Sequence, residues 1–295
     1  MVQKFLHDLM KVKSALRLLC CFVTPAISTL HAQEAKLPWP NPTQVIRLWP
    51  GAAPGLVDPQ KKEEIFNERI RNVSVPELWL YLPPGDIKKR KSIVICPGGG
   101  YVHHAMGLHV GNVVKLFHQN DVVVFGLKYR TRYGANDVAA DAVADCERAI
   151  RLIRHRAVEW GIDQIAVQGY SAGGNIGLNL LGCWDAGNAD AEDAIERQSS
   201  RPDLVALMCP WPNGRTIAHY KILANPPPVF VASAADDKTA PQRFAHDIAT
   251  EVQKQNGKVR EFDVPTGGHA AFHYGVSEGP GAQWPDPLFE MWKSL

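Results

Sequence analysis

Short apolar runs rich in β-branched residues alternate with helical stretches over most of this chain. The runs typical of strands lie at 77–82, 92–96, 121–128, 164–168, 204–209, 228–232 and 259–264. The clearest helical spacing of apolar residues lies between them, at 105–120, 136–160, 172–183 and 242–255. Strands that alternate with helices pair in parallel, and the helices then cover both faces of the sheet. The alternation therefore predicts an α/β fold built on a mostly parallel, twisted sheet.

The segment that precedes these strands has a different character. Residues 33–75 are rich in Pro and Gly, which predicts an irregular lead-in with one edge strand at 43–48. No Pro- or Ser-rich linker interrupts the chain after residue 75, and residues 76–295 are enough for one substantial core. We therefore expect a single α/β domain over 76–295.

The N-terminus has the pattern of a targeting segment. Basic residues up to Arg17 precede an apolar stretch at 18–30, and small residues follow around Ala32. This order predicts a secretory signal peptide over 1–32, and hence a secreted or periplasmic protein. The apolar stretch is short and contains Pro25, so we expect no stable membrane insertion. The alternative is an uncleaved amphipathic helix.

Charge argues against a nucleic-acid partner. The 295 residues carry a formal net charge of +2 without any basic block. The first 32 residues contain four of the Lys and Arg residues and one of the acidic ones, so the remainder is nearly neutral. The sequence does not indicate an oligomeric state.

One short motif joins a predicted strand to a predicted helix. Gly169-Tyr170-Ser171-Ala172-Gly173 has the form G-x-S-x-G and stands between the strand at 164–168 and the helix that follows. This context is typical of a nucleophile elbow, where a sharp turn exposes the serine hydroxyl at the edge of the sheet. The positive end of the helix dipole favours negative charge there. Ser171 is therefore the predicted nucleophile.

A glycine-rich loop follows the earlier strand at 92–96. In Pro97-Gly98-Gly99-Gly100, the missing side chains let backbone N–H groups approach a reacting carbonyl. Such donors stabilise the oxyanion of acyl transfer by about 3–4 kcal/mol each. We predict that the amides of Gly99, Gly100 and Ala172 form this oxyanion hole. A phosphate loop fits less well, because no Lys-Ser/Thr pair follows and no G-x-G-x-x-G is present.

An acid and a histidine follow Ser171 in the order expected for an elbow serine. Asp237 comes after the strand at 228–232, and its neighbour Asp236 competes for the role of orienting an imidazole. His269 follows the last strand and two glycines, with His273 as its competitor. We predict Asp237 and His269 as the acid and the base.

Further residues near these motifs are candidates for substrate contact. They are Tyr101, His103, Tyr170 and Trp211, although buried packing explains such aromatic residues at least as often. No two of the other histidines, His118, His155, His219 and His246, have zinc-site spacing, and the cysteines form no C-x-x-C, so we predict neither a metal nor another cofactor. Cys96 and Cys209 lie in apolar runs as small hydrophobic residues, and no disulfide pair can be named.

The motifs together resemble a known family. The segments concerned are 94–101, Tyr129-Arg130, Asp141, 148–151, 160–163 and 169–174, with a similar lead-in at 46–55. They resemble the esterase/lipase group of α/β hydrolases, and most closely bacterial acetyl-esterase and feruloyl-esterase-like enzymes that carry xylan-related names. The resemblance implies a serine esterase that removes acetyl or feruloyl groups from xylan fragments through an acyl-enzyme. Its partner would be a small-molecule or oligosaccharide ester.

Two departures from that group bear on the substrate. Pro97 stands where the lipase relatives have a histidine, and Ser171 and Asp237 lie only 66 positions apart, which leaves little room for a lid. Three alternatives stay open. The first is a serine peptidase of the same fold, although the sequence shows no propeller-sized domain. The second is a glycoside hydrolase such as a xylanase, which requires paired carboxylates. The third is a non-catalytic binding module, which would lack a triad residue.

Overall fold

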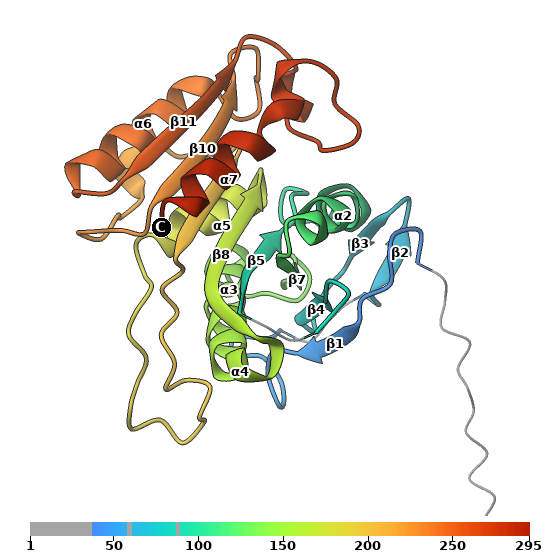
Figure 1. Cartoon of the computed structure of the whole chain (residues 1–295). Helices are drawn as coiled ribbons and strands as arrows, with labels where there is room; N and C mark the ends of the chain where they lie inside the picture. The colour runs from blue at the N-terminus through green and yellow to red at the C-terminus, as the bar shows by residue number, and fades with distance from the viewer. Residues whose placement is uncertain (1–36, 58–60, 87–88) are drawn as a thin grey trace, which may run out of the picture. The chain divides into compact units, whose positions relative to one another are not determined.

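The computed structural model describes residues 37–57, 61–86 and 89–295, so the predicted signal peptide lies outside the described residues. An eight-stranded sheet forms the centre, in the order β1-β4-β7-β5-β8-β9-β10-β11 (Figure 1). Its strands are β1 (Gln44–Arg47), β4 (Glu77–Tyr81), β5 (Arg90–Cys96), β7 (Val123–Lys128), β8 (Ile162–Tyr170), β9 (Leu204–Met208), β10 (Val229–Ala234) and β11 (Val259–Val264). The pairs β1–β4 and β4–β7 are antiparallel, and all the others are parallel.

Helices cover both faces of this sheet, which confirms the predicted fold class. In β5, Ile93 and Ile95 point to one face and Val94 and Cys96 to the other, as the two-residue period of a strand requires. The first face packs against α2 (Asn112–Gln119) and α7 (Pro285–Lys293). The second packs against α3 (Val138–His155), α5 (Ala172–Leu180) and α6 (Gln242–Lys254).

A second, three-stranded antiparallel sheet was not predicted. It consists of β2 (Glu64–Phe66), β3 (Arg69–Arg71) and β6 (His103–His104), in the order β2-β3-β6. Asn67 and Glu68 form the two-residue turn of the β2–β3 hairpin with φ of 41° and 60°, as primed turns require. The described part of 37–75 therefore contains two more strands than the one edge strand expected at 43–48. Strands of three residues are too short to show periodicity in the sequence.

The helices also differ from expectation in detail. The predicted helix at 105–120 begins as a π-helical turn, Gly107–Gly111, before α2. The helix predicted at 136–160 breaks at Arg156, where α3 ends and the short α4 (Ala157–Trp160) follows. The final helix, α7, had no clear sequence signal. Within the described ranges, no helix is both long and apolar enough to cross a bilayer.

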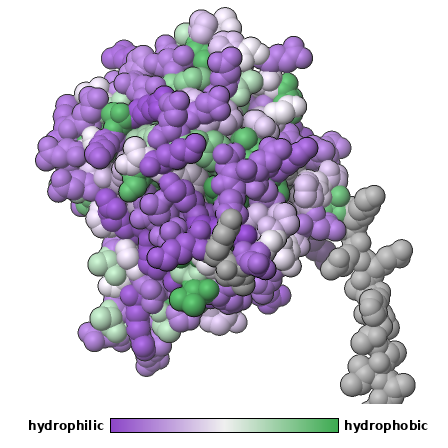
Figure 2. Space-filling model, in the orientation of Figure 1, coloured by the Kyte–Doolittle hydropathy of each residue, from purple (hydrophilic) through white to green (hydrophobic). Residues whose placement is uncertain are grey.

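The connections around β9 carry little regular structure. Between α5 and β10 the chain forms only β9 and the single 3₁₀ turn Ile217–His219, so no helical cap is inserted there. The chain between these two elements is therefore consistent with the predicted absence of a large lid. On the face drawn in Figure 2, hydrophobic residues are scattered among hydrophilic ones.

A buried ion pair fastens the N-terminal segment to the core. The Arg130 guanidinium binds both carboxylate oxygens of Asp145, and both side chains are fully buried. Trp49 donates its indole N–H to Asp145 at 3.0 Å, and Arg130 also donates to the Pro54 carbonyl. Arg148 donates to the Leu48 carbonyl at 2.8 Å. The lead-in thus supplies additional hydrogen bonds to charged groups that are buried in the core.

Candidate active site

The turn between β8 and α5 holds Ser171 in a strained backbone conformation. Its φ and ψ are 54° and −112°, a region that residues with side chains rarely adopt. Space for the turn exists only because glycines flank it. A Cβ on Gly169 would lie 2.0 Å from the Gly173 carbonyl oxygen, and one on Gly173 would lie 1.9 Å from that of Cys96. The G-x-S-x-G spacing therefore reflects the close approach of β8, α5 and β5.

Three side chains from separate elements form a continuous hydrogen-bonded chain. His269 Nε2 lies 2.8 Å from Ser171 Oγ, and His269 Nδ1 lies 2.7 Å from Asp237 Oδ2. The other carboxylate oxygen of Asp237 accepts the amides of Thr239 and Ala240 at 2.7 and 2.9 Å. An ionised carboxylate only accepts, so Nδ1 carries the proton and Nε2 is free to accept one from Ser171.

The environment keeps Asp237 ionised at neutral pH. Burial raises the pKa of this carboxyl, but the hydrogen bond from His269 and the backbone amides of Ala240 and Thr239 outweigh it, so the pKa lies below its ordinary value. The charge is then available to stabilise an imidazolium on His269.

The two competing residues have different contacts. Asp236 accepts the amides of Gly267 and Gly268 at 3.2 and 2.7 Å, so it fastens the loop that carries His269. His273 packs its ring 4.7 Å from that of Tyr170. Tyr170 in turn donates its hydroxyl to the His269 carbonyl at 2.6 Å. These contacts bring Asp237 and His269 to Ser171, and place Asp236 and His273 around them.

The glycine loop lies beside Ser171. Gly99 and Gly100 line the same cavity as the serine, and no hydrogen bond from either amide is formed with any described residue. A Cβ on Gly99, where φ is 140°, would lie 1.9 Å from the His103 carbonyl oxygen, so only glycine fits. Ala172 opens α5, where its amide has no partner within the helix. Three donors are therefore available near Ser171.

A histidine that sequence reasoning missed supports this loop. The Gly98 amide donates to His109 Nδ1 at 2.9 Å, and the His109 ring stacks on that of Tyr170 with centroids 4.3 Å apart. His109 therefore links the glycine loop to the residue beside Ser171. Its place in a predicted helix gave no sign of this role, because the contact depends on tertiary packing.

The cavity above Ser171 has a volume of about 430 Å³. It is lined by Arg69, Gly99, Gly100, His103, Ala105, Leu108, His109, Tyr170, Ser171, Trp211, Thr239, His269 and His273. His103, Tyr170 and Trp211, which are candidates for substrate contact from the sequence, all line this cavity. Tyr101 is a correction: it is buried away from the cavity and donates its hydroxyl to Asn175 Oδ1 at 2.8 Å. Its large ring fills the core rather than facing substrate.

A second cavity of about 430 Å³ lies beside α3 and the end of α5. Its lining includes Glu147 and the thiol-bearing Cys183. Cys183 lies at the surface, but desolvation and the nearby carboxylates of Glu147 and Asp185 raise the pKa of its thiol, which disfavours the nucleophilic thiolate. The cavity lined by Ser171 is therefore the better candidate for catalysis.

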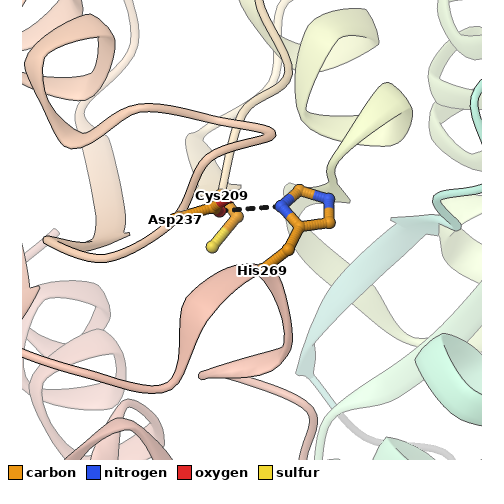
Figure 3. A group of neighbouring side chains, drawn as sticks. All are labelled: Cys209, Asp237 and His269. Carbon is orange, nitrogen blue, oxygen red and sulfur yellow. Dashed lines mark hydrogen bonds and ion pairs between the residues drawn. The ribbon is translucent and has the colours of Figure 1, made fainter.

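One group of side chains near His269 has spacing that a metal ion could use. The donor atoms of Cys209, Asp237 and His269 lie within 4.8 Å of one another. Figure 3 shows the three side chains together, with the Asp237–His269 hydrogen bond as a dashed line. Both ring nitrogens of His269 already make hydrogen bonds, one to Asp237 and one to Ser171. Burial raises the pKa of the Cys209 thiol. These contacts suit an acid–base chain better than a ligand set, and the expectation of no metal stays a prediction.

Comparison with known proteins agrees with this geometry. Residues 78–207 match the BD-FAE family model. Fold and family match define the class: the chain is a serine esterase of the α/β-hydrolase fold, an enzyme that hydrolyses carboxylic esters. Among solved structures, it is similar to an acetyl ester-xyloside bifunctional hydrolase from Caldicellulosiruptor lactoaceticus. The two are 25% identical with a TM-score of 0.65, over 86% of this chain and 94% of that one.

Two further structures share the fold. A butyrate-bound thermophilic esterase from the planctomycete Thermogutta terrifontis is 21% identical, over 81% of this chain and 94% of its own, with a TM-score of 0.59. MGS-M1, an α/β hydrolase from a Medee basin deep-sea metagenome, is 22% identical, over 74% and 92%, with a TM-score of 0.59. No curated protein matches the chain in sequence.

Proposed function

We propose that this esterase removes short acyl groups, such as acetyl, or feruloyl groups from plant polysaccharide fragments, with xylan as the parent polymer. Ser171 is the nucleophile, His269 the general base and Asp237 the residue that orients it. One observation carries the proposal: the chain of hydrogen bonds from Asp237 through His269 ends at Ser171, in a cavity lined by Gly99 and Gly100, whose amides donate to none of the described residues.

The reaction follows from these contacts. Ser171 Oγ attacks the ester carbonyl while His269 Nε2 takes the hydroxyl proton. The carbonyl oxygen becomes an oxyanion and accepts the amides of Gly99, Gly100 and Ala172. As the tetrahedral intermediate collapses, the carbon–oxygen bond of the ester breaks and Nε2 returns the proton to the departing alcohol. A water molecule, deprotonated by His269, then attacks the acyl-enzyme carbonyl. The bond to Ser171 Oγ breaks, the serine regains its proton from His269, and the acid is released.

The cavity supports a small substrate. Its volume of about 430 Å³ suits an acyl group with one or two sugar rings rather than a long fatty chain. The acetyl ester-xyloside hydrolase that shares this fold acts, by its name, on both esters and xylosides. Glycosidase action requires two carboxyl groups that flank the bond. Among the residues that the structure describes, no Asp or Glu lines this cavity, which favours ester hydrolysis over glycoside hydrolysis.

A labelling experiment tests the nucleophile. A fluorophosphonate probe should modify Ser171 in the wild-type enzyme and leave Ser171→Ala unlabelled, whereas Ser294→Ala, an exposed serine on the last turn of the chain, should label normally. Persistent labelling of Ser171→Ala contradicts the assignment. Acetylated xylo-oligosaccharides, feruloylated ones and unsubstituted xylan are then compared as substrates. Release of acid from one of the first two, without cleavage of xylan, is the expected result.

We also propose that residues 1–32 form a signal peptide and that the mature enzyme is secreted. The proposal is supported by the basic residues that precede the apolar stretch at 18–30. Expression of the full chain in a bacterium with a secretion pathway, followed by N-terminal sequencing, tests it. A mature protein outside the cytoplasm that begins near residue 33 is expected, and an intracellular protein that keeps its first 32 residues would overturn it.

A further inference from the structure

The β2–β3 hairpin brings one arginine to the cavity that contains Ser171. In β3 the middle residue, Ile70, is fully buried, so strand alternation directs Arg69 and Arg71 to the opposite face. His104 of β6 is buried like its partner Ile70, and His103 lies opposite Arg71. Arg69 and His103 both line the cavity. The hairpin therefore forms part of the wall around the reacting ester.

Arg69 has no carboxylate partner within the described part of the chain. Of the groups in the described ranges, its guanidinium donates to the Asn67 carbonyl alone, at 3.2 Å. Arg71, two residues further on, forms an ion pair with Glu64 at 2.7 Å. The two arginines lie on the same face of one strand, but Arg71 is neutralised by Glu64 within the hairpin, whereas Arg69 lines the cavity and has no such partner among the described residues.

The charge on Arg69 is not balanced elsewhere in the cavity wall. Of the described residues that line the cavity, Arg69 is the one Lys or Arg, and none is Asp or Glu. Burial lowers the pKa of His103, His109 and His273, so these three are neutral at neutral pH. The positive charge of Arg69 also lowers the pKa of His103 and of His109, so its field reaches both rings. The cavity therefore presents a fixed positive charge.

We propose that Arg69 determines specificity by binding a carboxylate on the ester substrate, so that the preferred substrate is anionic. The guanidinium group matches the planar geometry of a carboxylate and can form two parallel hydrogen bonds with it. This inference rests on the proposed serine-esterase function of the same cavity. The carboxylate has two chemical sources: a uronic acid on the alcohol side of the ester, or the free end of a dicarboxylic acyl group.

Matched substrate pairs separate these sources. In the first arm, acetate release from an acetylated methyl glucuronide is compared with release from the acetylated methyl glucoside. In the second arm, p-nitrophenyl hemisuccinate is compared with its methyl ester, with p-nitrophenol release as the signal. The variants are Arg69→Gln, Arg69→Lys and the matched control Arg71→Gln. The readout is the ratio of kcat/KM for the anionic substrate to that for its neutral partner.

In the wild-type enzyme we expect this ratio to be about 10 to 100 in one arm, the range that a charged hydrogen bond supplies. Arg69→Gln should bring it to about 1 through a higher KM, Arg69→Lys should restore part of it, and Arg71→Gln should leave it unchanged. Added salt should lower the wild-type ratio. A wild-type ratio near 1 in both arms, or one that Arg69→Gln leaves intact, overturns the inference. Failure of the proposed function would appear differently, as p-nitrophenyl acetate hydrolysis that does not depend on Ser171.

Discussion

At the scale of single residues, two neighbouring aspartates divide the work around His269. Asp237 contacts the imidazole, and Asp236 holds the two glycine amides that precede it. Both carboxylates follow β10, and sequence alone could not separate them, because both lie at the end of the same strand. The structure separates them by which groups face each one.

Substitution of each aspartate by asparagine makes this difference measurable. Asp237→Asn removes the charge that holds Nδ1–H, so kcat for p-nitrophenyl acetate should fall by about 10⁴ with little change in KM. Asp236→Asn keeps an oxygen that can accept the Gly268 amide, so its kcat should fall less than about tenfold. Steady-state kinetics on both variants gives the answer, and equal losses would contradict the division of roles.

Buried His104 predicts a loss of stability in mild acid. Burial lowers its pKa well below the ordinary value, so the folded chain resists a proton that the unfolded chain accepts below about pH 6.5. Because the unfolded state then binds more protons, the free energy of unfolding decreases as pH falls below that point, by about 2 kcal/mol at pH 5 from this group.

His104→Leu should therefore reduce the loss of stability between pH 7 and pH 5, as measured by urea unfolding at both values. The exposed His155 is the matched control, and His155→Leu should leave the pH dependence as it is in the wild type. A pH dependence that His104→Leu does not change would show that other groups cause the acid sensitivity.

At the scale of elements, the large sheet was predictable and the small one was not. Strands such as β5 and β7 are continuous apolar runs, a pattern that can be recognised in the sequence without knowledge of the fold. The strands β2, β3 and β6 are two or three residues long, and β6 pairs with β3 across more than thirty positions of sequence. Nothing local encodes that pairing, so the hairpin that carries Arg69 was missed.

The residues of the candidate site also differ in whether the sequence could predict them. Ser171, His269 and an aspartate at 236 or 237 could be predicted, because each follows a recognisable strand and because their order along the chain is typical of an elbow serine. Arg69 and His109 reach the cavity through tertiary packing, from a hairpin and a helix without a motif. Tyr101 was placed wrongly for the converse reason, since a residue next to the glycine loop in sequence need not face the same space.

Packing of α5 against β5 depends on one glycine. A methyl group at position 173 would meet the Cys96 carbonyl oxygen at 1.9 Å, and the backbone on both sides would have to move. Gly173→Ala should lower the free energy of unfolding by about 3 kcal/mol. Gly51→Ala, where a Cβ meets nothing within 4 Å, should leave stability nearly unchanged in the same urea titration. Similar stability for the two variants would refute this account of the elbow.

At the scale of the whole described unit, the buried Arg130–Asp145 pair joins β7, α3 and the lead-in. Its two charges were not apparent as partners in the sequence, although both lie near segments that resemble the family. Removal of Asp145 leaves the fully buried Arg130 guanidinium with the longer 3.3 Å contact to Asp141 as its remaining ion pair among the described residues, which is more damaging than loss of an exposed ion pair.

Asp145→Ala should therefore lower the free energy of unfolding by about 3–5 kcal/mol. Glu159→Ala, which removes the solvent-exposed pair with Arg156, should cost less than about 1 kcal/mol. Equilibrium unfolding in urea compares the two. A small effect at Asp145 would mean that the N-terminal segment can release Arg130 to water.

The β2–β3 hairpin is joined to the rest of the enzyme by few contacts of its backbone. Beyond its covalent ends, it pairs with β6 at two positions and accepts the Gly107 amide through the Glu68 carbonyl at 3.0 Å. None of these contacts involves Ser171, Asp237 or His269. With Ile70 kept as a core residue, libraries confined to the other positions of residues 64–71 offer a way to change which esters the enzyme accepts without altering Ser171, Asp237 or His269.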